Sequence, residues 1–165
     1  MTWRAHKTIT FSAVYLITHS FPAALIAALS SVFPDFIEFV WWCGRVPRYA
    51  HRKGSHWFVP YLAAALLAFY GLKTAPAFPA WVAFGVLWFA VGCLAHIVED
   101  ALTGRVPLLS PRRRSFGLRF FRTGSTPETI LTAVLGGLAI VTLFREHYRF
   151  VAAHLEVFFR EAGLF

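Results

Sequence analysis

Residues 80–102 read AWVAFGVLWFAVGCLAHIVEDAL, and this stretch decides the kind of fold to expect. Before His96 it holds only apolar residues and glycines, and roughly 20 such residues in a helix cross the ~30 Å hydrocarbon core of a bilayer. His96 and Asp100 then follow four residues apart, so on a helix they share a face and can reach one ion. Gly92 and Cys93, one turn earlier, would let another helix approach closely. The stretch predicts a membrane-spanning helix that ends in two metal-binding side chains.

The composition of the whole chain also favours lipid over water as its solvent. Hydrophobic residues make up 58% of the 165 residues and charged residues 15%, against about 25% charged in typical soluble domains. A small soluble domain has a large surface relative to its volume and needs polar residues to cover it. This composition supplies few of them. The alternative is a very apolar soluble helical bundle. The two cysteines, Cys43 and Cys93, form no CxxC motif and indicate no disulfide framework.

Four further apolar segments accompany residues 80–102 and lie at about residues 8–18, 23–42, 56–72 and 127–144. Pro34 should kink or restart the second of them, because proline disrupts a helix interior. The first residues lack an Ala-x-Ala cleavage site, so we do not expect a removable signal. We predict an all-α integral membrane bundle of about four to five apolar helices in residues 1–145, followed by an amphipathic helix at an interface in residues 146–165.

The positive charges gather at one end of this predicted bundle. Short connections make successive helices antiparallel neighbours, so the starts and ends of alternate segments share a side. Twelve of the 16 basic residues lie on that side: Arg4, Lys7, Arg45, Arg48, Arg52, Lys53, Arg105, Arg112, Arg113, Arg114, Arg119 and Arg122. The positive-inside rule makes this side cytoplasmic and indicates a bacterial-type inner membrane. It also explains the net charge of +8 without nucleic acid, although a nucleic-acid role for the 112–122 loop is an alternative.

Five separate segments deliver metal-binding side chains to the same side. Asp35 and Glu38, three residues apart after Pro34, are costly in an apolar segment unless they are paired or bind a metal. Imidazole and carboxylate ligands together suit zinc or a similar divalent cation. The expected ligands are His6, Asp35, His51, His56, His96 and Asp100, with Glu38 as general base or additional ligand and Arg52 as support for an anionic substrate; Glu128 lies nearby.

Each of these groups also has a plainer interpretation. His96 and Asp100 would form a helix-end pair in which the carboxylate holds the histidine tautomer. His56 would cap its helix and His51 would be a solvated loop residue. The two carboxylates after Pro34 would pair with arginines at 45 or 48, and Glu99 would pair with an arginine of the basic loop.

The motifs in this order resemble a known family. They are Phe33-Pro34-Asp35, His51-Arg52-x-x-Ser55-His56, and His96-x-x-x-Asp100-x-x-Thr103 followed by Val106-Pro107-Leu108-Leu109-x-Pro111. Together with His6 near the start, residues 6–128 resemble the YdjM-like family of membrane-bound metal-dependent hydrolases. The family looks distantly similar to zinc-dependent phospholipases C and single-strand nucleases, so the resemblance implies phosphoester hydrolysis.

Two positions depart from the family pattern. A common form has Pro-Asp-x-Asp-His, whereas here Ile37 replaces the second aspartate and Glu38 follows; Ser55 stands where threonine is usual. The sequence therefore predicts a membrane-bound, zinc-dependent hydrolase that acts on a phosphoester or lipid-like substrate at the cytoplasmic membrane face, with membrane lipids as partners. The alternative is a non-enzymatic membrane protein in which a metal staples helix ends together.

Overall fold

The computed structural model describes residues 1–47, 51–74, 79–108 and 110–161. Arg48, the middle of the connection near residue 76, Leu109 and the last four residues of the expected tail lie outside the described residues. The elements in chain order are α1 (Trp3–Thr18), α2 (Phe21–Ser30), α3 (Phe33–Trp41), the short 3₁₀ helix η1 (Gly54–His56), α4 (Phe58–Lys73), α5 (Ala80–Thr103), β1 (Val106–Pro107), β2 (Arg114–Phe116) and α6 (Thr126–Glu161). The all-α membrane bundle expected from the sequence is confirmed.

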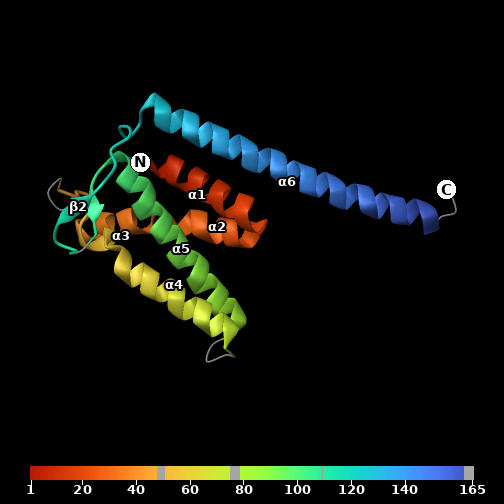
Figure 1. The fold of residues 1–165 in the computed structure, drawn as a ribbon, viewed down its shortest axis with the longest axis horizontal. Coiled ribbons are helices and arrows are strands. Elements are labelled where there is room, and N and C mark those ends of the chain that lie inside the picture. Colours follow the sequence, from red (N-terminus) through yellow and green to blue (C-terminus); the bar gives the residue numbers. More distant parts are fainter. Residues whose placement is uncertain (48–50, 75–78, 109, 162–165) are drawn as a thin grey trace.

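Local sequence explains where the helices begin. Thr2 caps α1 by accepting a hydrogen bond from the backbone N–H of Ala5, and Ser20 caps α2 in the same way before Pro22. Pro34 occupies the first turn of α3, so the apolar segment of residues 23–42 is divided into two helices as expected. This restart places Asp35 and Glu38 on a short helix that points toward the motif at residues 51–56 (Figure 1).

Small residues let the central helices pack closely. α2 contacts both α1 and α5, α4 packs along α5, and α6 packs along α1. Ala23, Ala24 and Ala27 of α2 are completely buried in this core. Gly92 of α5 faces α2 so closely that a Cβ there would lie 2.1 Å from the carbonyl oxygen of Ala27. The expected close helix approach before His96 is therefore present, and it fixes the position of α5 against α2.

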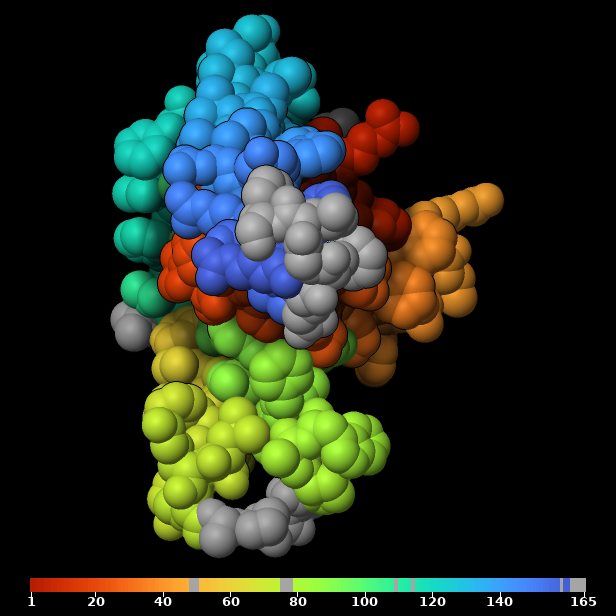
Figure 2. Space-filling view, turned by 90° about the vertical axis from the view of Figure 1, so that its right-hand side faces the viewer, coloured from red at the N-terminus to blue at the C-terminus, as the bar shows by residue number. Residues whose placement is uncertain are grey.

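In the described parts of the chain, three helical stretches are long and apolar enough to cross a membrane: Phe21–Trp41, Ala80–Thr103 and Thr126–Val157. The last belongs to α6, which continues through residues 145 and 146 without a break and extends well beyond the other helices (Figure 1). Residues 146–161 of the expected tail are thus the second half of one long helix. A view from that side shows the end of α4 and the start of α5, yellow to light green, as a lobe set apart from α1 and α6 (Figure 2).

The basic loop between α5 and α6 contains structure that the sequence did not indicate. β1 and β2 form a two-stranded antiparallel pair in which Val106 lies opposite Phe116. The loop then returns to the end of α5, where the backbone N–H groups of Leu118 and Phe120 donate to the carbonyl oxygens of Ala101 and Leu102. These bonds hold the loop against the helix end that carries Asp100.

Candidate metal centre

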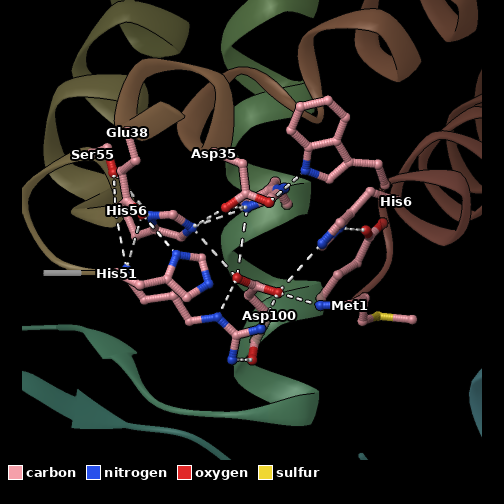
Figure 3. Close-up of polar contacts among 12 residues, drawn as sticks. Met1, His6, Asp35, Glu38, His51, Ser55, His56 and Asp100 are labelled. Atoms are coloured by element: carbon pink, nitrogen blue, oxygen red, sulfur yellow. Dashed lines mark hydrogen bonds and ion pairs between the residues drawn. The ribbon is translucent and has the colours of Figure 1, made fainter. Parts of the chain in front are cut away.

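Four potential ligand atoms meet where the first turn of α3, the end of η1 and the last turns of α5 come together (Figure 3). The Nε2 atoms of His56 and His96 are 3.1 Å apart. Asp35 Oδ1 lies 3.3 Å from His56 Nε2 and 3.7 Å from His96 Nε2. Asp100 Oδ2 lies 3.4 Å and 3.6 Å from the same two nitrogens. His56, His96 and Asp100 are buried, so the group is an enclosed cluster of two imidazoles and two carboxylates.

The dimensions of this cluster fit a tetrahedral divalent ion. Zinc binds nitrogen and carboxylate oxygen at about 2.0–2.2 Å, so neighbouring ligand atoms of a tetrahedral site lie roughly 3.3–3.5 Å apart. The five separations given above, 3.1 to 3.7 Å, span that value. Two imidazole nitrogens that face each other at 3.1 Å also need a proton or a cation between them, because their lone pairs otherwise repel. The donor set is therefore suited to hold zinc.

Glu38 and Ser55 hold the ring of His56 in the orientation that metal binding requires. Ser55 Oγ donates to Glu38 Oε1 at 2.6 Å, so the Nδ1–H of His56 can donate to Ser55 Oγ at 2.9 Å and to Glu38 Oε1 at 3.1 Å. With the hydrogen on Nδ1, the Nε2 lone pair of the neutral ring faces the cluster. Metal-bound histidines commonly have such a carboxylate partner behind them.

Surrounding carboxylates also give this part of the site a strong preference for positive charge. Burial favours the neutral form of His56, but its contacts with Asp100, Asp35 and Glu38 outweigh burial and raise its pKa from 6.5 to about 10. In the metal-free protein, a proton on His56 supplies part of the positive charge that these carboxylates require. A divalent cation can take over this role.

Arg52 holds Asp100 from the outer side of the cluster. Its Nε lies 2.6 Å from Asp100 Oδ2, and its NH2 group donates to Asp100 Oδ1 at 2.8 Å and to Thr103 Oγ1 at 3.3 Å. The amino group of Met1 lies 2.5 Å from Asp100 Oδ1. The two contacts from Arg52 fix the plane of the Asp100 carboxylate and hence the direction of its lone pairs.

His6 reaches the same carboxylate from α1. Its Nε2 lies 3.3 Å from Asp100 Oδ1, the oxygen that is not part of the four-atom cluster. Its Nδ1 lies 2.5 Å from Glu99 Oε2, and its ring stacks on that of His96 with centroids 4.0 Å apart. His6 therefore supports both α5 ligands by packing, and its expected role as a ligand stays a prediction.

His51 forms a more open part of the site, next to the buried side chain of Glu38. His51 Nδ1 lies 2.7 Å from Glu38 Oε2, and the His51 side chain is 41% exposed. Asp35, Glu38 and His51 also offer ligand atoms within 4.8 Å of one another, so the expectation that His51 and Glu38 bind metal stays a prediction. Glu38 accepts a further bond from the backbone N–H of Arg52 at 3.0 Å, which ties the 51–56 segment to α3.

The sequence comparisons identify the family of the chain. The family model described as YdjM inner membrane protein matches residues 1–159, which includes every motif residue of the site. The chain belongs to the YdjM inner membrane protein family. No curated protein and no solved structure matches the chain. The YdjM resemblance stated from the motifs is therefore confirmed, and the distant similarity to zinc-dependent phospholipases C stays a prediction.

Within this YdjM protein, some polar residues serve the site in ways the motifs did not indicate. Trp3 Nε1 donates to Asp35 Oδ2 at 2.9 Å, leaving Oδ1 for the cluster. The expected pairing of Glu99 with a loop arginine is wrong: Glu99 is buried and bonded to His6 and Thr10. Glu128 lies apart from the cluster and accepts from the backbone of Thr2. The sequence signal for Glu99 was the presence of an acidic residue in an apolar helix. No local sequence pattern indicated the contact made by Trp3.

Proposed function

We propose that this protein is a membrane-bound, divalent-metal-dependent hydrolase, with zinc as the metal and a phosphoester or lipid-like molecule as the substrate. The observation that carries the proposal is the cluster formed by Asp35, His56, His96 and Asp100, whose facing atoms are 3.1–3.7 Å apart. A divalent cation held there supplies Lewis-acid polarisation of the scissile group and acidifies water. Membership of the YdjM inner membrane protein family supports the membrane location.

Residues around the cluster orient the ligands, face the substrate and transfer protons. Glu38 and Ser55 orient His56, and Arg52 orients Asp100 while presenting its guanidinium toward an anionic substrate. His51 is half exposed and carries a carboxylate partner on Nδ1, so its Nε2 is suitably placed to accept or return a proton. In this arrangement Glu38 serves as the base through His51 and as the support of His56. The crowding of arginines near the site supports an orientation in which the site faces the cytoplasm, by the positive-inside rule.

The second candidate function is a structural metal site. Three of the four cluster ligands are almost fully buried, Asp100 at 1% and His56 and His96 at 0% exposure, while the Asp35 side chain is 14% exposed. Closed coordination by four protein ligands is typical of structural zinc. In that case the ion would join α3, η1 and α5 without reacting with a substrate. Both functions predict bound metal, but only the hydrolase function predicts substrate turnover.

The test compares the wild type with a His96→Ala, Asp100→Ala double variant, purified in detergent without chelators. A His147→Ala, Glu156→Ala double variant removes the same kinds of groups from the exposed surface of α6 and serves as the control. We expect about one divalent ion per chain in the wild type and the control and none in the site variant. Absence of stoichiometric metal in the wild type would contradict both functions.

Hydrolysis of a generic phosphodiester then separates the two candidates. We expect metal-dependent turnover in the wild type and the control, lost in the site variant and after chelation. Stoichiometric metal without turnover of phosphodiesters, phosphomonoesters or phospholipids would favour the structural site over the hydrolase.

A further inference from the structure

A cavity lies on the outer side of the Arg52–Asp100 contact. It has a volume of about 570 Å³ and is lined by side chains that donate hydrogen bonds or carry positive charge: His51, Arg52, Thr103, Arg105, Arg119 and Thr123. The lining contains three arginines and no carboxylate. Such a wall is complementary to an anion, whereas the metal cluster next to it is complementary to a cation.

Close backbone contacts hold the walls of this cavity in place. A Cβ on Gly104 would lie 1.9 Å from NH1 of Arg52, and a Cβ on Gly117 would lie 1.8 Å from the carbonyl oxygen of Gly104. The guanidinium of Arg52 therefore lies directly against Gly104. The backbone of Gly104 in turn lies directly against Gly117. Arg119 adopts a left-handed backbone conformation, φ 55°, beside the bonds that join Leu118 to the end of α5. The cavity is thus a fixed part of the fold.

Two of the three arginines have no anionic partner among the described residues. Arg52 is occupied by Asp100, but neither Arg105 nor Arg119 forms an ion pair with any acidic group in the described parts of the chain. Both are exposed at the rim of the same cavity. Two unpaired guanidinium groups with nearby hydroxyls suit the tetrahedral oxygens of a phosphate, which arginine binds with two parallel hydrogen bonds.

We propose that this cavity binds a phosphate group and that Arg105 and Arg119 are its principal binding residues. As a substrate subsite, which rests on the proposed hydrolase function, it would hold an anionic phosphate of the substrate next to the metal cluster, with Arg52 between the two. The adjacent arginines at 112 and 113 do not line the cavity. Binding is therefore assigned to Arg105 and Arg119 and not to the run of arginines that dominates the loop sequence.

The test measures binding of radiolabelled inorganic phosphate by equilibrium dialysis, with the full chain in phosphatidylcholine nanodiscs and a chelator present. An Arg105→Gln, Arg119→Gln double variant removes the proposed contacts. An Arg112→Gln, Arg113→Gln double variant removes the same charge from the same loop and is the matched control. We expect saturable binding by the wild type and the control, with affinity lowered about tenfold or more in the Arg105/Arg119 variant, because two charge-assisted contacts are lost.

A second arm identifies the source of the phosphate. In this arm, part of the phosphatidylcholine is replaced with phosphatidic acid. Binding of radiolabelled phosphate should be abolished if the natural ligand is a lipid headgroup and unchanged if the natural ligand is soluble. Either result supports phosphate binding in the cavity. Equal losses in the two double variants would overturn the proposal, since they would show that general surface charge is responsible. Absence of saturable binding in both arms would also overturn it. Because metal-free protein is used, failure here leaves the hydrolase assay unaffected, and failure of turnover leaves phosphate binding unaffected.

Discussion

Replacing Gly92 by alanine should both loosen the bundle and weaken the metal centre. A Cβ at this position would lie 2.1 Å from the Ala27 carbonyl oxygen and 2.1 Å from Ser30 Oγ. The first of these is backbone, which cannot rotate away, so α5 and α2 must separate by roughly 1 Å to restore ordinary contact. Overpacking of this kind costs about 1–3 kcal/mol, and the rigid neighbour favours the upper end of that range.

The size of the effect follows from two opposing contributions. Alanine improves helix propensity over glycine by about 1 kcal/mol, which leaves a net loss of about 2 kcal/mol for Gly92→Ala. Gly85 lies on the same helix, and a Cβ there would meet nothing within 4 Å. Gly85→Ala is therefore the matched control and should be neutral or stabilising by up to about 1 kcal/mol.

The assay has two readouts in detergent micelles. Unfolding monitored by circular dichroism should rank the proteins as Gly85→Ala, wild type and Gly92→Ala, from most to least stable. Zinc titration should show affinity lowered about tenfold or more for Gly92→Ala only, because His96 lies one turn beyond Gly92 and moves with α5. Equal stability and equal zinc affinity in the two variants would refute the reasoning that the α2–α5 contact positions the ligand.

Three other perturbations test the supports of the centre. Glu38→Gln should lower zinc affinity about 10–100-fold while metal content at saturating zinc is retained; affinity within twofold of the wild type would show that Glu38 does not orient His56. Arg52→Gln should destabilise the metal-free protein by about 3 kcal/mol, because it leaves Asp100 buried without its main partner, and the loss should shrink when zinc is bound; an equal loss with and without zinc in thermal unfolding would contradict this. His56 has a raised pKa of about 10, so its stabilising charge in metal-free protein is present below pH 6.5 and lost as the pH rises through 10. Zinc must displace that proton, so zinc affinity should increase with pH up to about 10. The released proton should make the binding heat in calorimetry depend on the buffer. A binding heat that is independent of the buffer would contradict this prediction.

The sequence predicted those features that depend on local pattern and helix alternation. The apolar run that ends in His96 and Asp100 predicts α5 almost to the residue. Pro34 predicts the restart that begins α3. Alternating antiparallel helices predict that Asp35, His56 and the α5 ligands share one end. The structure brings one potential ligand atom of each of these residues within 4.8 Å of the others.

Features that depend on long-range packing could not be predicted in this way. The contact of Trp3 with Asp35 joins residues 32 positions apart, and that of His6 with Glu99 joins residues 93 apart. Neither pair has a spacing that a helix or strand pattern would reveal. The small strand pair in the basic loop has the same origin, since it forms where the loop folds back on the end of α5.

The order in which the ligands occur along the chain also bears on how the protein is made. Asp35 and His56 precede α5, while His96 and Asp100 are near its end. A growing chain that has inserted α1 to α4 has half of the donor set, and the other half arrives only when the last turn of α5 has left the ribosome. The proposed metal site is complete only after that point. Zinc loading would therefore mark a completed step of membrane insertion, and a truncation before residue 96 should leave the protein unable to retain the ion.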